Sequence, residues 1–128
     1  MKHDLISDIF TTIRNAEALG KKECIVPASN LAKNILKIMQ KEKYIGEVSY
    51  IEDGKGGKLR IQLLGKINEC GAVRPRFSAG KDEIIKFEKR FLPAADIGIL
   101  ILSTSQGVMT HKDAKKRSIG GVLLGYVY

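Results

Sequence analysis

The chain has no tryptophan, and aromatic residues make up only 6% of its 128 residues. With so few rings, and no alternation of aromatic with basic residues, we do not expect a platform on which successive single-stranded bases stack. No apolar run approaches the roughly 20 residues that a membrane-spanning helix needs. The first residues also lack the apolar block and small-residue cleavage site of a secretion signal, so the sequence predicts a cytoplasmic protein with no membrane partner.

Reactive and metal-binding residues are equally scarce. The two cysteines, Cys24 and Cys70, have no CxxC spacing, which argues against a disulfide or a zinc site. Neither His3 nor His111 has a nucleophile or carboxylate arranged beside it as catalysis requires. The glycine-rich stretch 53–57 lacks the spacing of a phosphate-binding loop. We therefore expect no catalytic residue, metal, cofactor or small-molecule substrate.

The sequence has an excess of positive charge. Its 22 lysines and arginines outnumber its 14 aspartates and glutamates, which leaves a formal net charge of +8. Such a balance favours a polyanion as the partner. Because the aromatic residues needed for base stacking are few, recognition of a folded RNA by its shape and minor groove suits this composition better.

Hydrophobic periodicity in the first half predicts two amphipathic helices and three strands. Asp4 is expected to cap a helix that runs to about Gly20, and Ser29 a second helix that runs to about Glu42. One strand lies between the helices, and two more follow, joined by a glycine-rich turn. The strands are expected at residues 23–26, 45–52 and 58–64. The order α-β-α-β-β indicates a first module over residues 1–66.

The second half predicts a mainly β module with short helices over residues 67–128. The expected elements are a strand at 72–77 interrupted by Pro75, a helix at 82–91, a buried strand at 97–102 and a final strand at 122–128. Thr110 and Asp113 fit a capping box that begins a short basic helix before the final strand. The chain is therefore predicted to be an α+β protein of two small modules.

Two polar segments are candidates for contact with RNA. The predicted turn Ser103-Thr104-Ser105-Gln106-Gly107 follows a buried strand, and its hydroxyl and amide groups both donate and accept hydrogen bonds. On the second helix, Lys33, Lys37 and Lys41 recur every four residues and form a basic ridge. The alternatives are an ordinary serine- and threonine-rich turn and a solvated helix face.

Short motifs stand in a fixed order along the chain. They are Ile13-Arg14-Asn15-Ala16, Val26-Pro27-Ala28-Ser29, Tyr44-Ile45 and the segment Ser103 to Thr110, followed by a basic helix and Gly120-Gly121. With these motifs the chain resembles the small-subunit ribosomal protein S8 family over nearly its whole length. The segments 50–54, 64–68, 74–77 and 87–94 resemble its archaeal and eukaryotic cytosolic branch. Asn30 departs from the lysine that is common in relatives after Pro-Ala-Ser.

The resemblance implies a primary rRNA-binding protein of the small ribosomal subunit. Such a protein binds the central domain of small-subunit rRNA, supports assembly of the platform and neighbours other small-subunit proteins. In the family, the C-terminal module makes the main RNA contacts and the N-terminal module adds others. The RNA-binding residues that the resemblance implies are Ser103, Thr104, Ser105, Gln106, Gly107, Arg14, Ser29 and Lys33.

Two other functions stay open from the sequence alone. A free-standing RNA-binding translational regulator would share the charge and the polar turn but would not stay with ribosomal subunits. A small hydrolase or RNA-modifying enzyme would need a reactive group, for which His111 is the candidate to test.

Overall fold

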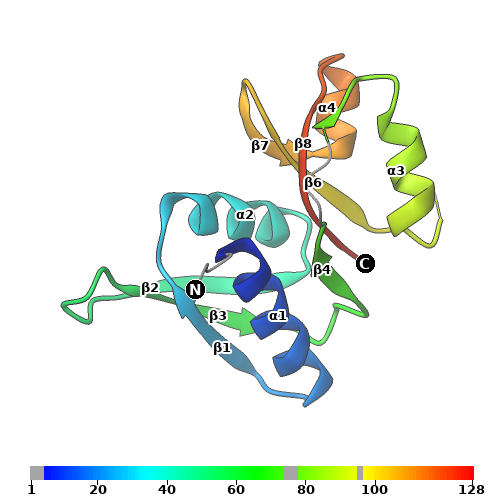
Figure 1. The fold of residues 1–128 in the computed structure, drawn as a ribbon. Coiled ribbons are helices and arrows are strands. Elements are labelled where there is room, and N and C mark those ends of the chain that lie inside the picture. The colour runs from blue at the N-terminus through cyan, green and yellow to red at the C-terminus, as the bar shows by residue number, and fades with distance from the viewer. Residues whose placement is uncertain (1–4, 74–77, 95–96) are drawn as a thin grey trace. The chain divides into compact units, whose positions relative to one another are not determined.

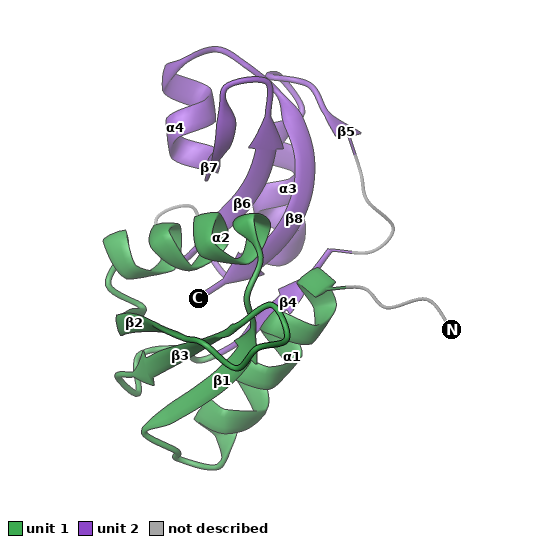
Figure 2. Cartoon of the chain, turned by 90° about the vertical axis from the view of Figure 1, so that its left-hand side faces the viewer, with its two compact units in different colours: residues 1–68 green, residues 69–128 purple. Residues whose placement is uncertain are grey.

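The computed structural model describes residues 5–73, 78–94 and 97–128. It separates into two compact units, residues 1–68 and 69–128 (Figure 2). Helices and antiparallel sheets occur in both units, and this confirms the predicted α+β class. Asp4, which was expected to cap the first helix, and the segment 74–77 lie outside the described residues.

Unit 1 has the predicted order of two helices and three strands (Figure 1). Its elements are α1 (Leu5–Ala18), β1 (Glu23–Pro27), α2 (Asn30–Lys41), β2 (Ile45–Ile51) and β3 (Lys58–Leu63). The strands form an antiparallel sheet in the order β1-β3-β2. Apolar residues at helical spacing bury one face of α1, namely Ile6, Ile9, Phe10, Ile13 and Ala16.

The beginning of α2 is fixed by a side-chain cap, as its sequence predicted. Ser29 has extended backbone angles, and its hydroxyl accepts a hydrogen bond from the backbone N–H of Ala32 at 3.0 Å. The turn between β2 and β3, which accepts the backbone N–H of Ala28 at the Gly57 carbonyl, uses the glycines that its sequence offers. Gly54, Gly56 and Gly57 all have positive φ, between 74° and 96°.

Unit 2 is built around a sheet in the order β4-β8-β6-β7, with β5 paired to β8 as well. Its strands are β4 (Cys70–Ala72), β5 (Ser78–Ala79), β6 (Ile99–Thr104), β7 (Gly107–Thr110) and β8 (Gly121–Val127). Its helices are α3 (Ile84–Phe91) and α4 (His111–Lys116). Thr110 caps α4 by accepting the backbone N–H of Asp113 at 3.2 Å, which confirms that Thr110 begins this helix as predicted.

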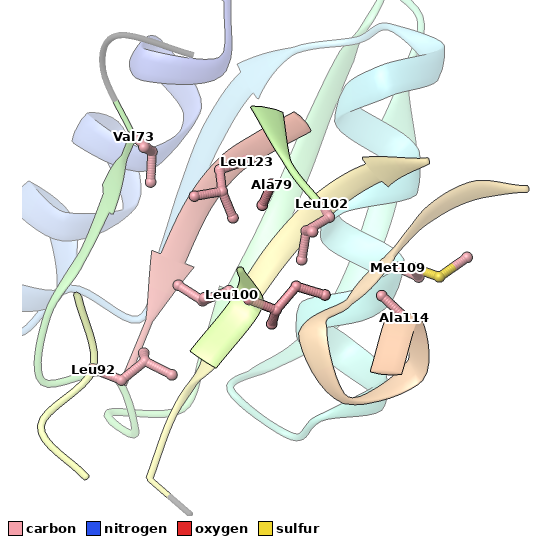
Figure 3. Close-up of a cluster of buried hydrophobic side chains, with 9 residues drawn as sticks. Val73, Ala79, Leu92, Leu100, Leu102, Met109, Ala114 and Leu123 are labelled. Carbon is pink, nitrogen blue, oxygen red and sulfur yellow. The ribbon is translucent and has the colours of Figure 1, made fainter. Parts of the chain in front are cut away.

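The core of unit 2 joins both helices to the sheet (Figure 3). Buried side chains from nearly every element contribute to it, namely Val73, Ala79, Ile84, Leu92, Leu100, Leu102, Met109, Ala114 and Leu123. Strand β6 is fully buried from Ile99 to Leu102, as its continuous apolar run predicted. The rest of β6 and the hairpin that follows therefore extend from a rigid base.

Several boundaries differ from the sequence prediction, many of them by one residue. The buried strand begins at Ile99 rather than residue 97, because Gly98 has a φ of +88°, outside the β region. Strand β4, at Cys70–Ala72, was not predicted, and there Cys70 pairs with Val127 and is fully buried, whereas most of the strand expected at 72–77 lies outside the described residues. The helix expected from residue 82 begins at Ile84.

No helix in the described part of the chain has both the length and the apolar content to cross a membrane.

Candidate nucleic-acid interface

The polar segment predicted as a turn is the tip of the hairpin between β6 and β7. Ser103 and Thr104 belong to β6 and pair with Val108 and Gly107, respectively. The turn itself is thus shorter than predicted, and it consists of Ser105 and Gln106. Strand pairing explains the difference, since the hydroxyl-bearing residues at 103 and 104 complete the antiparallel ladder.

The Thr104 hydroxyl holds the tip together from inside. It donates a hydrogen bond to the carbonyl oxygen of Gly107 at 2.8 Å and accepts one from the backbone N–H of Gln106 at 3.1 Å. Since its proton and one acceptor position are both used, this hydroxyl is less available to a ligand than the sequence suggested. Ser105, Gln106 and Gly107 are exposed beyond it. Thr104 therefore stabilises the turn, whereas Ser105, Gln106 and Gly107 are available at the surface for a ligand.

The Gln106 side chain is oriented by a residue that the sequence prediction missed. Arg117 follows the last turn of α4, and its Nη1 donates a hydrogen bond to Oε1 of Gln106 at 2.9 Å. A guanidinium only donates, so the amide oxygen must face Arg117, and the amide NH₂ is left to meet an external acceptor. The signal in the sequence was weak, because Arg117 was one basic residue among several in that helix.

Two glycines, Gly107 and Gly121, permit the backbone arrangement at the hairpin tip. Gly107 has a φ of +112°, and a Cβ added there would have no atom within 4 Å, so its surroundings are open. At Gly121, on the neighbouring strand, a Cβ would lie 2.5 Å from the Ser103 carbonyl oxygen. Glycine therefore lets β8 pass close to the end of β6, while Gly107 leaves room for an approaching ligand.

Two of the three predicted residues in unit 1 lie near each other. Ser29 and Lys33 both line a hollow of about 360 Å³ at the beginning of α2. The Nζ atom of Lys33 lies 5.2 Å from the centroid of the Tyr50 ring, a cation–π contact. The Ser29 hydroxyl is engaged in capping α2, and Tyr50 was not predicted as part of any site. Arg14 is exposed on the other helix, α1.

The two cysteines lie inside the protein rather than at its surface. Both Cys24 and Cys70 are buried, and neither forms a disulfide. Burial, followed by the nearby Glu17 and Glu23 carboxylates, raises the pKa of Cys24 to about 11, so its thiol stays protonated at neutral pH. Among the described residues, no group of three histidine, cysteine or acidic side chains is arranged to hold a metal ion.

Comparison with known proteins gives consistent matches over the whole chain. A family model described as Ribosomal protein S8 matches residues 4–128. The chain is 52% identical over 126 residues to the small ribosomal subunit protein uS8 of Pyrobaculum islandicum, covering 98% of this chain and 97% of that protein. It is also 52% identical to the protein of the same name from Archaeoglobus fulgidus, over 129 residues and the full length of both.

Proposed function

Because the chain belongs to the ribosomal protein S8 family, we propose that it binds the central domain of small-subunit rRNA and supports assembly of the platform. The family is a structural, non-enzymatic component of the ribosome. Its relatives here are archaeal, in agreement with the branch that the sequence resembled. The partners that we propose are this rRNA and the neighbouring proteins of the small subunit, in the cytoplasm.

The observation that carries the proposal is the presentation of Ser105, Gln106 and Gly107 at the tip of a hairpin with a buried base. A loop held by the internal bonds of Thr104 loses little conformational entropy when it binds. The Ser105 hydroxyl both donates and accepts, and it suits a ribose 2′-OH or a base edge. The exposed Gly107 backbone lets an RNA strand approach closely.

We assign different shares of the binding to the two predicted modules. The module of residues 67–128 carries the main contacts, through the hairpin tip. The module of residues 1–66 adds contacts from Arg14, Ser29 and Lys33. The net charge of +8 supports both sets, because it attracts the phosphate backbone without depending on its sequence.

Substitution of Ser105 tests the proposed recognition loop. Ser105→Ala removes one exposed hydroxyl, so the free protein should keep its thermal stability. In the complex, an RNA donor or acceptor would lose its partner at about 1 to 3 kcal/mol, which corresponds to a tenfold to hundredfold loss of affinity. Affinity for a transcript of the small-subunit central domain is the measurement. Ser49→Ala, on an exposed serine of β2, is the matched control and should bind normally.

Two results of this measurement would contradict the proposed loop, and two further experiments test the ribosomal assignment. Unchanged affinity in a folded Ser105→Ala protein would place the recognition surface elsewhere. Affinity lost together with thermal stability would make the hydroxyl structural. Sedimentation of the tagged protein with small subunits, and a footprint confined to the central domain, would support the ribosomal assignment over a free-standing translational regulator.

A further inference from the structure

An open groove runs between α2 and the edge strand β2 in unit 1. Its volume is about 640 Å³, which is within the size range of small-ligand sites. The helix wall is a stripe of exposed polar residues at helical spacing, namely Asn30, Lys33, Asn34, Lys37 and Gln40. Amides and ammonium groups form this wall, and no carboxylate is among the described residues that line the groove. The wall is therefore complementary to an anion that also carries hydrogen-bonding edges.

The sheet side of the groove is apolar and ends in an aromatic ring. Leu59 of β3 is buried there and Val48 of β2 is half-buried, and the buried Leu36 of α2 adds an apolar side chain from the helix. Tyr50 pairs with Leu59 in the antiparallel register, so both side chains lie on the same face of the sheet. Tyr50 is 50% exposed, so this end of the groove is accessible to a ligand.

The Tyr50 ring is held in place by contacts at its edge. Its hydroxyl donates a hydrogen bond to Oε2 of Glu52 at 3.1 Å. A Cβ at Gly57 would lie 2.2 Å from the Tyr50 hydroxyl oxygen, so the absence of a side chain there makes room for the ring. Because the ring is already positioned, little entropy is lost when a flat group stacks on it.

Lys33 connects the ring with the charged wall. Its ammonium nitrogen is 5.2 Å from the ring centroid, at the end of a flexible four-carbon side chain. A planar base that stacks on the ring displaces this ammonium, which then pairs with the phosphate attached to the same base. Lys37, one helical turn further along the groove, supplies a second cation.

We infer that this groove binds one unpaired nucleotide of the RNA. The base stacks on Tyr50, the amides of Asn30 and Asn34 contact its edge, and Lys33 and Lys37 hold its phosphate. Proteins read single-stranded RNA by this combination of an aromatic face, edge-directed hydrogen bonds and phosphate-binding cations. One ring is enough for one nucleotide, so the scarcity of aromatic residues does not oppose this site. The inference rests on the proposed function for its partner class and shares Lys33 with it, but the residues that bind the base, Tyr50, Asn30 and Asn34, are not part of that proposal.

The test uses the ¹⁵N-labelled full chain and a ten-nucleotide single-stranded RNA of mixed sequence. We expect the side-chain amide signals of Asn30, Asn34 and Gln40 to shift as this oligonucleotide is added. Tyr50→Leu keeps an apolar side chain and removes the ring, and it should weaken the binding about tenfold to hundredfold. Lys41→Ala is the matched control, because it removes a lysine from the same helix outside the groove.

Thermal unfolding of each variant shows whether the groove is intact. The inference is overturned if Tyr50→Leu, still folded, binds the oligonucleotide as tightly as Lys41→Ala does. It is also overturned if the groove signals stay unchanged with RNA and shift only with another small-subunit protein. Groove shifts that persist while Ser105→Ala binds the central-domain transcript normally would contradict the proposed recognition loop and leave this inference standing.

Discussion

The Nδ1 atom of His111 accepts a hydrogen bond from the backbone N–H of Leu100 at 3.0 Å, and His111 is fully buried. Because Nδ1 is the acceptor, the neutral ring carries its proton on Nε2, which lies 3.8 Å from Oε1 of Glu88. Glu88 also pairs with Lys115. Burial lowers the pKa of His111, and this outweighs the opposing attraction of the Glu88 carboxylate.

A first prediction concerns the stability of unit 2 in acid. Histidine in an unfolded chain has a pKa of about 6.5, above the lowered pKa of the folded state. As the pH falls below 6.5, the unfolded chain binds more protons than the folded one, so the free energy of unfolding decreases. The stability that neutral, buried His111 contributes is fully present above pH 6.5, and it is lost as the pH falls through the pKa of His111 in the folded state. Urea unfolding followed from pH 7.5 to pH 5 measures this change.

The two histidines of the chain provide the control for this measurement. His111→Gln keeps an oxygen that can accept the Leu100 N–H and removes the titration, so it should flatten the pH dependence. His3→Gln removes the other histidine and should leave the dependence unchanged. Equal slopes for His111→Gln and the unsubstituted chain would contradict the assignment to His111.

Local patterns explain how much of the fold could be predicted from the sequence. The apolar spacing of α1, the Ser29 cap of α2 and the Thr110 cap of α4 act over a few residues, and all three were predicted. The strand β5 was not predicted. It has two residues, and it forms because Ser78 pairs with Val122, far away in the sequence. No local signal records such a pairing.

The same distinction applies to the candidate sites: residues that are consecutive in the sequence could be predicted to lie together, and residues far apart in the sequence could not. The hairpin tip was found because its polar residues are consecutive. The contact of Lys33 with Tyr50 joins residues 17 positions apart, and it exists because β2 pairs with β3 beneath α2. A count of aromatic residues could not show that one of them lines a groove.

A second prediction compares two lysines of the basic ridge. Lys33→Ala should weaken binding of the central-domain transcript about tenfold, because it removes one phosphate contact of a charged group. Lys41 lies in the last turn of α2, where its charge suits the helix dipole, and it should be mostly solvated. Lys41→Ala should therefore have little effect on affinity. Equal and negligible effects of both substitutions would make the ridge a solvated helix face.

A third prediction concerns salt. Each phosphate neutralised by a lysine or arginine releases counterions, with a slope of about −0.7 to −0.9 per contact in a plot of log affinity against log salt concentration. For the unsubstituted chain we expect a negative slope that corresponds to several phosphate contacts. For Lys33→Ala the slope should be less steep, by the amount that one contact contributes. Filter binding at several salt concentrations gives both values. A slope near zero would remove the electrostatic part of the proposed function.

The last prediction separates backbone strain from RNA contact at the hairpin tip. Gly107 has a φ of +112°, and a side chain added there would begin in open space, because its Cβ would have no atom of a more distant residue within 4 Å. Its cost is conformational, about 1 to 3 kcal/mol of stability, and it is largest for a β-branched residue. Gly107→Val should therefore lower the thermal midpoint and weaken RNA binding more than Ser105→Ala does, because it also blocks close backbone approach.

Gly20 offers the matched comparison for this prediction. It also has a positive φ, +70°, and a Cβ added there would likewise have no atom within 4 Å, but it lies after α1 rather than in the hairpin. Gly20→Val should also destabilise the chain through backbone strain, and it should leave RNA affinity unchanged wherever the chain is folded. Affinity and thermal unfolding are measured on both variants at a temperature well below either midpoint. If Gly107→Val loses no more affinity than Gly20→Val, close approach of RNA to the Gly107 backbone is not part of recognition.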